Sequence, residues 1–357
     1  MCSVSLSGAS ARRSGCRAWR YCQALHIMDV CIIRLGAFGD IIHTLPLAAD
    51  LHAAGHRVHW LCEERWRAII AGSPVIDRIH TIPRRASMTT LRKIARQLRR
   101  SYPFDAVIDA QGLAKSAWWL RGLGSPIRIG FRRGRAREGA WLLSNRRVPA
   151  HCTHVIDQQR CLALGLGLRP QGSARTPLPA WPAQRQWAHD WLQEHGLQQP
   201  YALNVGAGWP SKVWPQDFQR QFLQLLVNAG QRPLIIWGSP DERQVAEHLQ
   251  AQVPHSILTP ATDIPHLAGL LQHCRLLVSG DTGPLHLAAA CACPTLGLFG
   301  PVPCERNGPR GRHHRNLQAT APAWERKRAE RVDWSKLSPK IVLAAAHSIA
   351  HGAHGAS

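Results

Sequence analysis

Asp40 is the acidic residue best placed to act on a substrate hydroxyl. It ends the segment Arg-Leu-Gly-Ala-Phe-Gly-Asp at residues 34–40, directly after an apolar run at 30–33. An aspartate here would cap the following helix, which stabilises a helix by roughly 1 kcal/mol. It would also serve as a general base if one carboxylate oxygen stays exposed. The residues leave both roles open, but they exclude a Walker A loop because no Gly-Lys-Ser/Thr follows the glycines.

The loop at residues 204–212 has the composition of an anion-binding site. It reads Asn-Val-Gly-Ala-Gly-Trp-Pro-Ser-Lys and follows a predicted strand at 201–205. Small residues such as Ala207 and Gly208 let the backbone approach a ligand, and N–H groups at the start of the next helix attract a phosphate. Lys212 would add a mobile positive charge, although a solvated surface lysine is the ordinary alternative.

A third loop, Gly-Asp-Thr-Gly-Pro-Leu-His at residues 280–286, joins a predicted strand to a predicted helix. Asp281 and Thr282 are both suited to cap that helix, and the backbone N–H groups near Thr282 and Gly283 are suited to bind an anion. His286 lies one turn into the helix. A packed or surface histidine is the commoner role there, and a ligand contact is the alternative.

The fourth motif is Trp-Gly-Ser-Pro-Asp-Glu at residues 237–242. Glu242 lies near the start of a predicted helix, where the helix dipole favours an acidic residue in any case. The alternative is that Glu242 accepts hydrogen bonds from ribose hydroxyls, as acidic residues do in other nucleotide sites.

The chain is strongly basic. Its 357 residues include 44 Lys and Arg against 22 Asp and Glu, a formal net charge of +22. Such an excess favours an anionic partner, which is a nucleic acid, an anionic lipid or a phosphorylated substrate. In the first half of the chain, the segment Asp-Ala-Gln-Gly-Leu-Ala-Lys-Ser at 109–116 is followed by many arginines. Together these basic residues predict a cationic rim of Lys115, Arg128, Arg132, Arg133, Arg135 and Arg137. Such a rim is either an ordinary solvated basic face or a site for an anionic acceptor.

The elements that carry these loops alternate between strand and helix. The predicted strands are 30–33, 58–62, 106–108, 201–205, 233–237, 276–278 and 295–299. The predicted helices are 41–51, 89–100, 215–229, 241–251, 264–273 and 335–350, with an irregular Arg-rich segment at 305–333. The alternation predicts βαβ units and parallel sheets, whose ligands bind beyond the carboxyl ends of the strands.

The length predicts two domains. We place their boundary in the Pro-, Gln- and Trp-rich stretch at 168–198. The expected division is a disordered extension at 1–27, a first domain at 28–175, a second domain at 195–335 and a C-terminal helix and tail at 336–357.

Composition and spacing exclude several classes of protein. A hydrophobic fraction of 45% and a charged fraction of 18% exclude wholesale disorder. None of the 11 cysteines forms a Cys-x-x-Cys pair, so we expect no structural metal and a reducing, cytoplasmic compartment. We expect no membrane span, because no run of about 18 apolar residues is free of charge and proline. Residues 1–27 lack the continuous apolar region of a secretory signal.

Taken together, the motifs resemble those of glycosyltransferase family 9, the ADP-heptose:lipopolysaccharide heptosyltransferases. The segment SGDTGPLHLAAACACPTLGLFGPVPCERNGPRG at 279–311 resembles the family's D-T/S-G-x-x-H-L-x-A-A…P-x-x-x-L-F/Y-G-P-T signature, with Val302 in place of the usual Thr. RLGAFGDIIHTLP resembles the family's opening motif, and the whole resemblance covers about residues 28–311. The segments VIDAQGLAKSA and AREGAWLLSNRRV look most like the branch of the family that adds the first heptose to the Kdo of the inner core.

The resemblance implies the GT-B fold, in which two Rossmann-like α/β domains face each other across a cleft. The C-terminal domain would bind the nucleotide sugar and the N-terminal domain the acceptor. Asp40 matches the catalytic base, Lys212 the lysine on the donor phosphates and Glu242 the acid on the ribose. The residues that match contacts to the donor diphosphate and sugar are Thr282, Gly283 and His286.

The donor loop departs from that branch at two positions. Ala207 and Gly208 stand where the branch has hydroxyl residues, so only their backbone N–H groups remain to bind phosphate.

In the first domain, we expect Arg34, Lys115 and Arg137 to bind the acceptor.

The resemblance also implies partners and a location. We expect an inverting transfer from ADP-heptose to Kdo-lipid A that needs no cofactor and no divalent metal. Because the acceptor is anionic and membrane-embedded, we expect a peripheral protein on the anionic cytoplasmic face of the inner membrane. The alternatives are another family 9 enzyme, such as heptosyltransferase II or one for a different sugar, and a non-catalytic nucleic-acid-binding protein. We expect no nucleic-acid partner, because no RNP, KH or helix-turn-helix pattern is found.

Overall fold

The structure is a computed structural model of the chain, and it describes residues 27–352. The extension predicted at 1–27 lies outside the described residues except for Ile27, and residues 353–357 also lie outside them.

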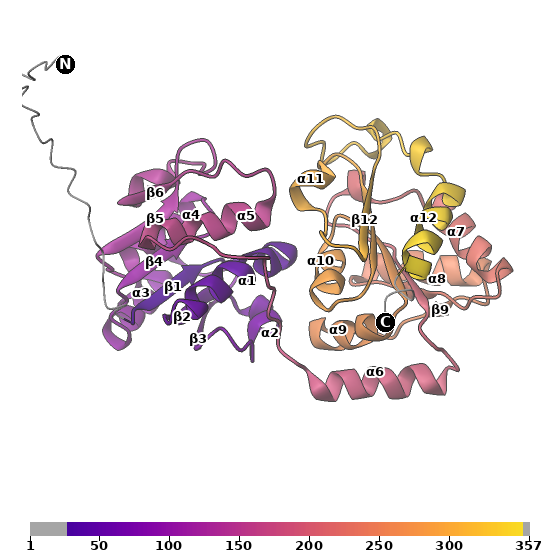
Figure 1. Ribbon diagram of the computed structural model, residues 1–357, viewed down its shortest axis with the longest axis horizontal. Coiled ribbons are helices and arrows are strands. Elements are labelled where there is room, and N and C mark those ends of the chain that lie inside the picture. The colour runs from indigo at the N-terminus through magenta and orange to yellow at the C-terminus, as the bar shows by residue number, and fades with distance from the viewer. Residues whose placement is uncertain (1–26, 353–357) are drawn as a thin grey trace, which may run out of the picture.

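Two separate six-stranded parallel sheets form the centres of two domains (Figure 1). The strands of the first sheet are β1 (Asp29–Ile33), β2 (Arg57–Glu63), β3 (Arg78–Ile82), β4 (Ala106–Asp109), β5 (Ile127–Phe131) and β6 (Arg146–Val148). The strands of the second sheet are β7 (Tyr201–Asn204), β8 (Leu234–Ile236), β9 (Ile257–Leu258), β10 (Leu276–Gly280), β11 (Thr295–Phe299) and β12 (His314–Gln318). The two strand orders are β3-β2-β1-β4-β5-β6 and β12-β11-β10-β7-β8-β9.

Both sheets have the same doubly wound topology. In each sheet, three successive strands are added to one side and the next three to the other, so the order reverses between β1 and β4 and between β7 and β10. A ligand crevice opens at the carboxyl ends of the two strands that flank such a reversal. The loops that follow these four strands carry four of the motifs, at 34–40, 109–116, 204–212 and 280–286. The fold therefore positions these motifs at the two crevices.

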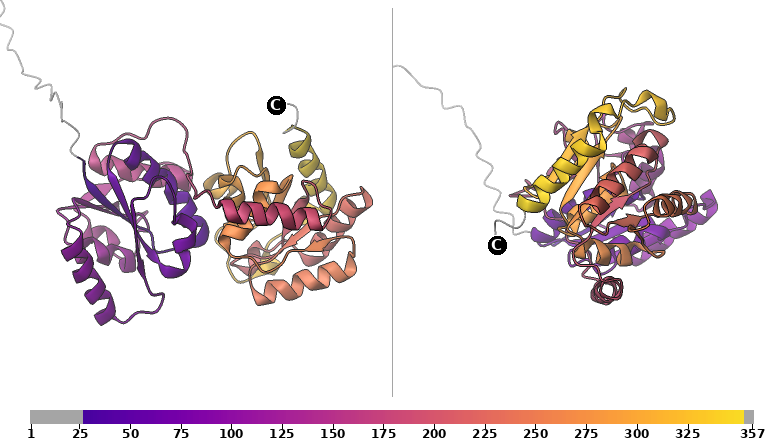
Figure 2. Two further views of the ribbon diagram at one scale, coloured as in Figure 1. Left: turned by 90° about the horizontal axis from the view of Figure 1, so that it is seen from below. Right: turned by 90° about the vertical axis from the view of Figure 1, so that its right-hand side faces the viewer.

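Helices pack on both faces of the sheets (Figure 2). Those of the first domain are α1 (Phe38–Ala53), α2 (Arg67–Ile70), α3 (Met88–Ser101), α4 (Ala114–Gly122) and α5 (Val155–Arg160). Those of the second domain include α7 (Gln216–Asn228), α8 (Pro240–Gln252), α9 (Ile264–His273), α10 (Gly283–Ala290) and α11 (Cys304–Asn307). Short 3₁₀ helices lie at Glu64–Trp66, Ala140–Leu143, Cys161–Leu166, Pro210–Lys212, Ala329–Arg331 and Ser335–Leu337. Within residues 27–352, no helix combines the length and the apolar character needed to cross a membrane.

Two helices outside the predicted second domain pack against it. Helix α6 (Pro182–Glu194) forms within the predicted boundary, lies beneath the second domain in Figure 1 and packs on α9. The ring of Trp187 on α6 stands 4.7 Å from that of His266 on α9. Helix α12 (Pro339–Gly352), predicted at 335–350, packs on α7, and its Val342 and Ala346 are fully buried in the second core. Both helices therefore belong structurally with the second sheet.

The strands predicted from apolar runs are confirmed, but several others were not predicted. The buried strand β1, for example, has Val30 to Ile33 without exposure, as expected of a parallel strand covered on both faces. The prediction of an irregular segment at 305–333 is wrong for β12, and β3, β5, β6 and β9 were also not predicted as strands. All of these except β5 are edge strands, and β6 and β12 expose polar side chains, so they lack a continuous apolar run. The inner strand β5 was missed because Arg128 and Gly130 interrupt its apolar run.

Candidate active site

A cleft of about 680 Å³ lies between the two domains, where loops from the carboxyl ends of both sheets meet. The structure gathers there every residue predicted for catalysis or donor binding. Those residues are Asp40, Ala207, Gly208, Lys212, Glu242, Thr282, Gly283 and His286. The loops that carry them follow β1, β7, β8 and β10, so the two doubly wound sheets together build one site.

Asp40 lies in the first turn of α1 and is ion-paired with Arg34. Arg34 is buried, and its Nη1 also donates a hydrogen bond to the carbonyl oxygen of Ala110 at 2.7 Å. The Asp40 carboxylate accepts only a long hydrogen bond of 3.5 Å from the N–H of Ala37, so its capping role is weak. Its side chain stays 44% exposed. Arg34 therefore holds Asp40 while leaving it accessible from the cleft, which a general base requires.

The first turns of α1 and α10 pack against each other across the domain boundary. The His286 ring lies 2.6 Å from the point where a Cβ on Gly39 would stand. A Cβ on Gly283 would likewise overlap the Phe38 ring. Both positions therefore need glycine for this approach, which brings Asp40 of the first domain next to the 280–286 loop of the second.

Lys212 is mostly buried and ion-paired rather than solvated, so the surface-lysine alternative is wrong. Its side chain is 13% exposed, and its Nζ lies 2.6 Å from Asp281 Oδ2 and 3.2 Å from the Asp281 carbonyl oxygen. The ammonium group also stands 4.4 Å from the centre of the Trp209 ring. This position holds the charge at the floor of the cleft, next to the N-terminus of α10.

Asp281 joins Lys212 to His286. Its carboxylate is almost fully buried, and its second oxygen lies 3.2 Å from His286 Nε2. Burial by itself raises the pKa of Asp281, but the hydrogen bond from His286 and the charge of Lys212 outweigh burial and hold the pKa below its usual value. Asp281 is therefore ionised and fixes both neighbours. The prediction that Asp281 caps α10 is wrong, because its carboxylate is taken up by these side chains.

Thr282 occupies the N-cap position of α10, but its hydroxyl does not cap the helix. The hydroxyl lies 2.9 Å from Ser279 Oγ instead. In the first turn of α10, the N–H groups of Gly283 and Leu285 have no partner within the helix, and Pro284 has no N–H. They therefore point an unneutralised helix N-terminus at the cleft, as an anion site requires.

Glu242 lies in the first turn of α8, whose N-cap residue is Ser239. Its N–H donates to Ser239 Oγ at 3.2 Å, and its carboxylate accepts from the N–H of Gly238 at 2.8 Å. A Cβ on Gly206 would overlap that carboxylate. Glu242 therefore lies at the start of a helix, as predicted, where the helix dipole favours an acidic side chain. It also lines the cleft. Its contact with a ribose stays a prediction.

The three residues expected to bind the acceptor do not line the cleft. Arg34 supports Asp40 from behind, as described above. Lys115 is well exposed, with its Nζ 3.9 Å from Glu63 Oε1, and Arg137 is exposed at the surface of the first domain. Their role in acceptor binding stays a prediction.

Sequence reasoning missed Arg306, which lines the cleft on the second-domain side. Its guanidinium stands 5.0 Å from the centre of the Trp324 ring. Burial lowers the pKa of Arg306, while the charges of Asp40 and Asp281 oppose that effect. Burial, with the nearby charges of Arg34 and Arg306, also lowers the pKa of Arg135 to about 10. Several arginines therefore lie around the Asp40 carboxylate. Arg135 belongs to the predicted cationic rim, whereas Arg306 was not singled out although it lies within the segment 279–311 that carries the family resemblance.

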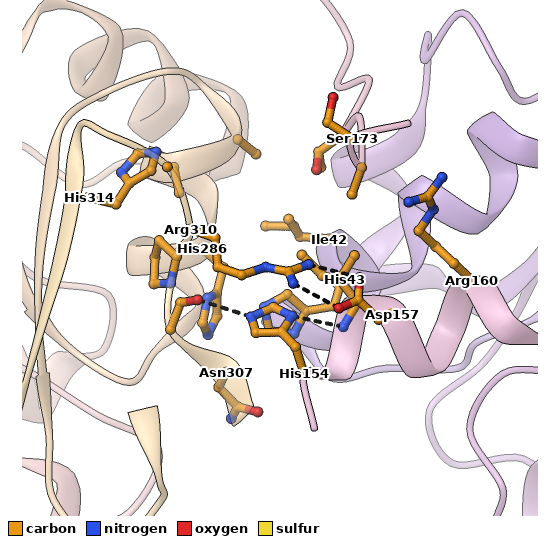
Figure 3. Close-up of a pocket in the computed structure, with 18 of the residues that line it drawn as sticks. Ile42, His43, His154, Asp157, Arg160, Ser173, His286, Asn307, Arg310 and His314 are labelled. Atoms are coloured by element: carbon orange, nitrogen blue, oxygen red, sulfur yellow. Dashed lines mark hydrogen bonds and ion pairs between the residues drawn. The ribbon is translucent and has the colours of Figure 1, made fainter. Parts of the chain in front are cut away.

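A second cavity, of about 580 Å³, lies between the domains behind His43 and His286 (Figure 3). The two rings meet edge to face with their centres 4.1 Å apart. Two further contacts cross the domain boundary beside it. Arg310 forms a bidentate ion pair with Asp157 at 2.7 and 2.9 Å, and His154 Nε2 lies 3.0 Å from the Gly308 carbonyl oxygen. These contacts hold the two domains in the arrangement that builds the cleft.

This interface should loosen in acid. Burial, followed by the proximity of His286, lowers the pKa of His43, and burial lowers that of His154. A histidine whose pKa is lowered in the closed form stabilises that form above its ordinary pKa of about 6.5 and loses this contribution as pH falls further. We expect small-angle X-ray scattering to show more open domains at pH 5.5 than at pH 7.5. A His43→Gln variant should open less on acidification, and an identical response in both proteins would contradict the assignment.

Known proteins resemble this chain in sequence and in fold. The model of the family "Glycosyltransferase family 9 (heptosyltransferase)" matches residues 91–335. The chain is 32% identical over 309 residues to lipopolysaccharide heptosyltransferase 1 of Pseudomonas aeruginosa, which covers 83% of this chain and 85% of the relative. It is 30% identical over 296 residues to the protein of the same name from Escherichia coli K12, with 77% and 88% covered.

Solved structures agree with this relationship. The E. coli heptosyltransferase WaaC with ADP-2-deoxy-2-fluoro heptose has a TM-score of 0.71 and 25% identity, and the match covers 90% of this chain and 99% of that one. E. coli ADP-heptose lps heptosyltransferase II has a TM-score of 0.73 at 19% identity over 90% and 98%, which supports the fold alone. With its GT-B fold of two facing Rossmann-like domains, its matched motifs and these relatives, the chain belongs to glycosyltransferase family 9 and is a glycosyltransferase.

Proposed function

We propose that this enzyme moves heptose from ADP-heptose to the Kdo of the lipopolysaccharide inner core, with inversion at the anomeric carbon. The observation that carries the proposal is the single cleft in which an exposed carboxylate of the first domain faces the lysine-bearing loop of the second. The subtype is supported by relatives named heptosyltransferase 1 at 30–32% identity, whereas a relative named heptosyltransferase 3 matches at 22%.

Asp40 acts as the general base. It takes the proton of the acceptor hydroxyl while that oxygen attacks the anomeric carbon, and ADP leaves from the opposite face. A positioned base of this kind contributes about 10²–10⁴-fold to the rate. Asp281, a second carboxylate that lines the cleft, is held by Lys212 and His286 and is not free to abstract a proton.

Lys212 stabilises the negative charge that develops on the departing diphosphate. An ammonium group has three donors, and two of them already point at Asp281, so one remains for a phosphate oxygen. The N-terminus of α10 supplies further donors beside it. Because these groups are fixed before the reaction begins, they stabilise the leaving group without reorganisation.

The cationic surroundings of Asp40 suit an anionic acceptor. After burial, the charges of Arg34 and Arg306 help to lower the pKa of Arg135, and Arg137 contributes to the same positive field. We propose that this field attracts the carboxylates of Kdo, with Lys115 and Arg137 at the outer rim. The acceptor is anchored in lipid, so the enzyme would work as a peripheral protein on the cytoplasmic face of the inner membrane.

We further propose that positively charged side chains neutralise the diphosphate, as a divalent metal ion does in other enzymes. Within residues 27–352, no three His, Cys, Asp or Glu side chains are arranged to hold a metal ion. In this scheme Lys212 neutralises the phosphates, so the reaction needs no added metal and no cofactor.

The test is incubation of the purified protein with ADP-heptose and Kdo₂-lipid A, followed by mass spectrometry of the lipid. We expect the mass of one added heptose, at the same rate with and without EDTA. An acceptor that already carries the first heptose should not be extended, and UDP-glucose should not replace the donor. Product formed only on the heptosylated acceptor would show heptosyltransferase II specificity instead, and a loss of rate in EDTA would contradict the metal-free scheme.

A further inference from the structure

Helix α3 and the loop before it carry an unusual concentration of positive charge. No acidic residue occurs between Asp77 and Asp105. All the cations from residue 84 to residue 100 have exposed side chains; we call them the α3 cations, and they are Arg84, Arg85, Arg92, Lys93, Arg96, Arg99 and Arg100. Among the described residues, none of them has an ion-pair or hydrogen-bond partner, so their charge is presented to whatever lies outside the protein.

The helix is oriented so that its cations point away from the protein. Ala95 and Leu98 are buried against the domain, and Leu91 and Ile94 are partly buried beside them. The charged residues occupy the remaining face. Helix α3 lies on the side of the first domain that is remote from the second domain (Figure 1). The cationic face is therefore open to a partner rather than turned toward the cleft.

The spacing of the charges is unfavourable for the isolated protein. Arg92, Arg96 and Arg100 follow one another at i, i+4 and i+8, where like charges destabilise a helix by a few tenths of a kcal/mol per pair. Other exposed helices of this protein pair their arginines, as Arg220 does with Asp217 and Arg243 with Glu247. The absence of any such acid on α3 points to an external anion.

The shape of the array fits a flat surface. The 14 residues of α3 form a rod about 21 Å long with cations along its length. Met88 in its first turn is a large apolar side chain that is 48% exposed. Five residues separate the carboxyl end of β3 from the start of α3, so this turn lies toward the same edge of the first sheet as Asp40. A planar anionic partner on α3 would thus extend along the first domain toward that edge.

We propose that the α3 cations dock this protein on an anionic phospholipid bilayer, by contact with the headgroup phosphates. The choice of a bilayer rests on the proposed function, since that function requires an acceptor held in lipid. Each basic residue at an anionic surface strengthens binding by about 1 kcal/mol, which corresponds to about five-fold in the partition coefficient. The helix keeps its apolar face for the protein core, so the docking is electrostatic and weakens with salt.

The experiment measures sedimentation of the full chain with vesicles of phosphatidylglycerol and phosphatidylethanolamine that contain no acceptor. The test variant is Arg92→Gln/Arg96→Gln/Arg100→Gln. The matched control is Arg315→Gln/Lys336→Gln/Lys340→Gln, which removes the same charge from exposed positions of the second domain. We expect the partition coefficient to fall roughly 100-fold in the test variant and less than five-fold in the control. Equal losses in both variants would overturn the proposal.

Two further measurements separate this proposal from the proposed function. With a water-soluble, delipidated acceptor, the test variant should turn over like the native protein, because α3 would serve only the bilayer. If its KM for that acceptor rises while vesicle binding is unchanged, the α3 cations bind acceptor saccharide and the docking proposal is overturned. If vesicle binding falls as expected and no protein transfers heptose, docking is supported and the proposed function fails. If the protein binds single-stranded RNA tightly and vesicles only weakly, the partner of the α3 cations is a nucleic acid and the docking proposal is overturned.

Discussion

Replacement of Asp40 by asparagine is expected to lower turnover by about 10²–10⁴-fold while leaving the affinity for ADP unchanged. The asparagine has the size of the native side chain and still accepts the weak hydrogen bond from Ala37, but it cannot take a proton from the acceptor hydroxyl. Initial rates with ADP-heptose and acceptor, together with calorimetric titration of ADP, measure the two effects. The loss should appear in kcat, because the substituted group acts in the transition state.

The Asp40 variant needs a control for folding, since Arg34 loses its ion-pair partner and is buried. A buried charge without its partner destabilises a protein, so some fall in thermal stability is expected and should be measured. Asp217→Asn removes an exposed ion pair with Arg220 on α7 and serves as the matched change away from the cleft. If Asp40→Asn retains more than a tenth of native turnover, Asp40 is not the base.

Replacement of Lys212 by methionine is expected to have the second large effect. Methionine is an unbranched side chain only one atom shorter than lysine, and it removes the charge that lies beside the α10 N-terminus. Loss of one preorganised group at a developing negative charge typically costs about 10²–10³-fold in kcat. The affinity for ADP should fall as well, because Lys212 also faces the diphosphate of free ADP, which carries more negative charge than the diphosphate of the sugar nucleotide. Rates and ADP titration measure the two losses.

A second variant distinguishes a phosphate-binding role of Lys212 from a role in stability alone. In Lys212→Met, the buried Asp281 carboxylate loses its cation, so the variant should be less stable. The double variant Lys212→Met/Asp281→Asn removes both charges and should recover stability without recovering ADP affinity or turnover. If ADP affinity returns with stability, or never falls in the single variant, Lys212 does not contact the phosphates.

Much of the fold follows from local sequence patterns. Buried parallel strands such as β1 and β10 need continuous apolar runs, and the loops after them need small and capping residues. Both signals are visible along the chain, so the doubly wound halves and their loops were predicted. The edge strands β6 and β12 were not, because an exposed edge tolerates arginine and asparagine and shows no apolar run.

The chemistry of individual side chains depended on contacts between distant residues. Asp281 looked like a helix cap, yet it binds Lys212 from a loop 69 residues away. Arg34 looked like an acceptor contact, yet it is buried behind Asp40 and bonded to Ala110 across the sheet reversal. A capping pattern is read from neighbours in sequence, whereas an ion pair needs only proximity in space. No spacing rule could have distinguished these roles.

The sequence by itself determined that two parallel α/β halves would carry glycine-rich loops at their strand ends, because hydrophobic periodicity and turn chemistry are local properties. Only the tertiary structure decided how the halves meet. The approach of α1 to α10 depends on Gly39 and Gly283 fitting against rings of the opposite domain, and the ion pair of Arg310 with Asp157 spans 153 residues. Such contacts depend on shape and on charge brought together by folding, and they turn two separate crevices into one cleft.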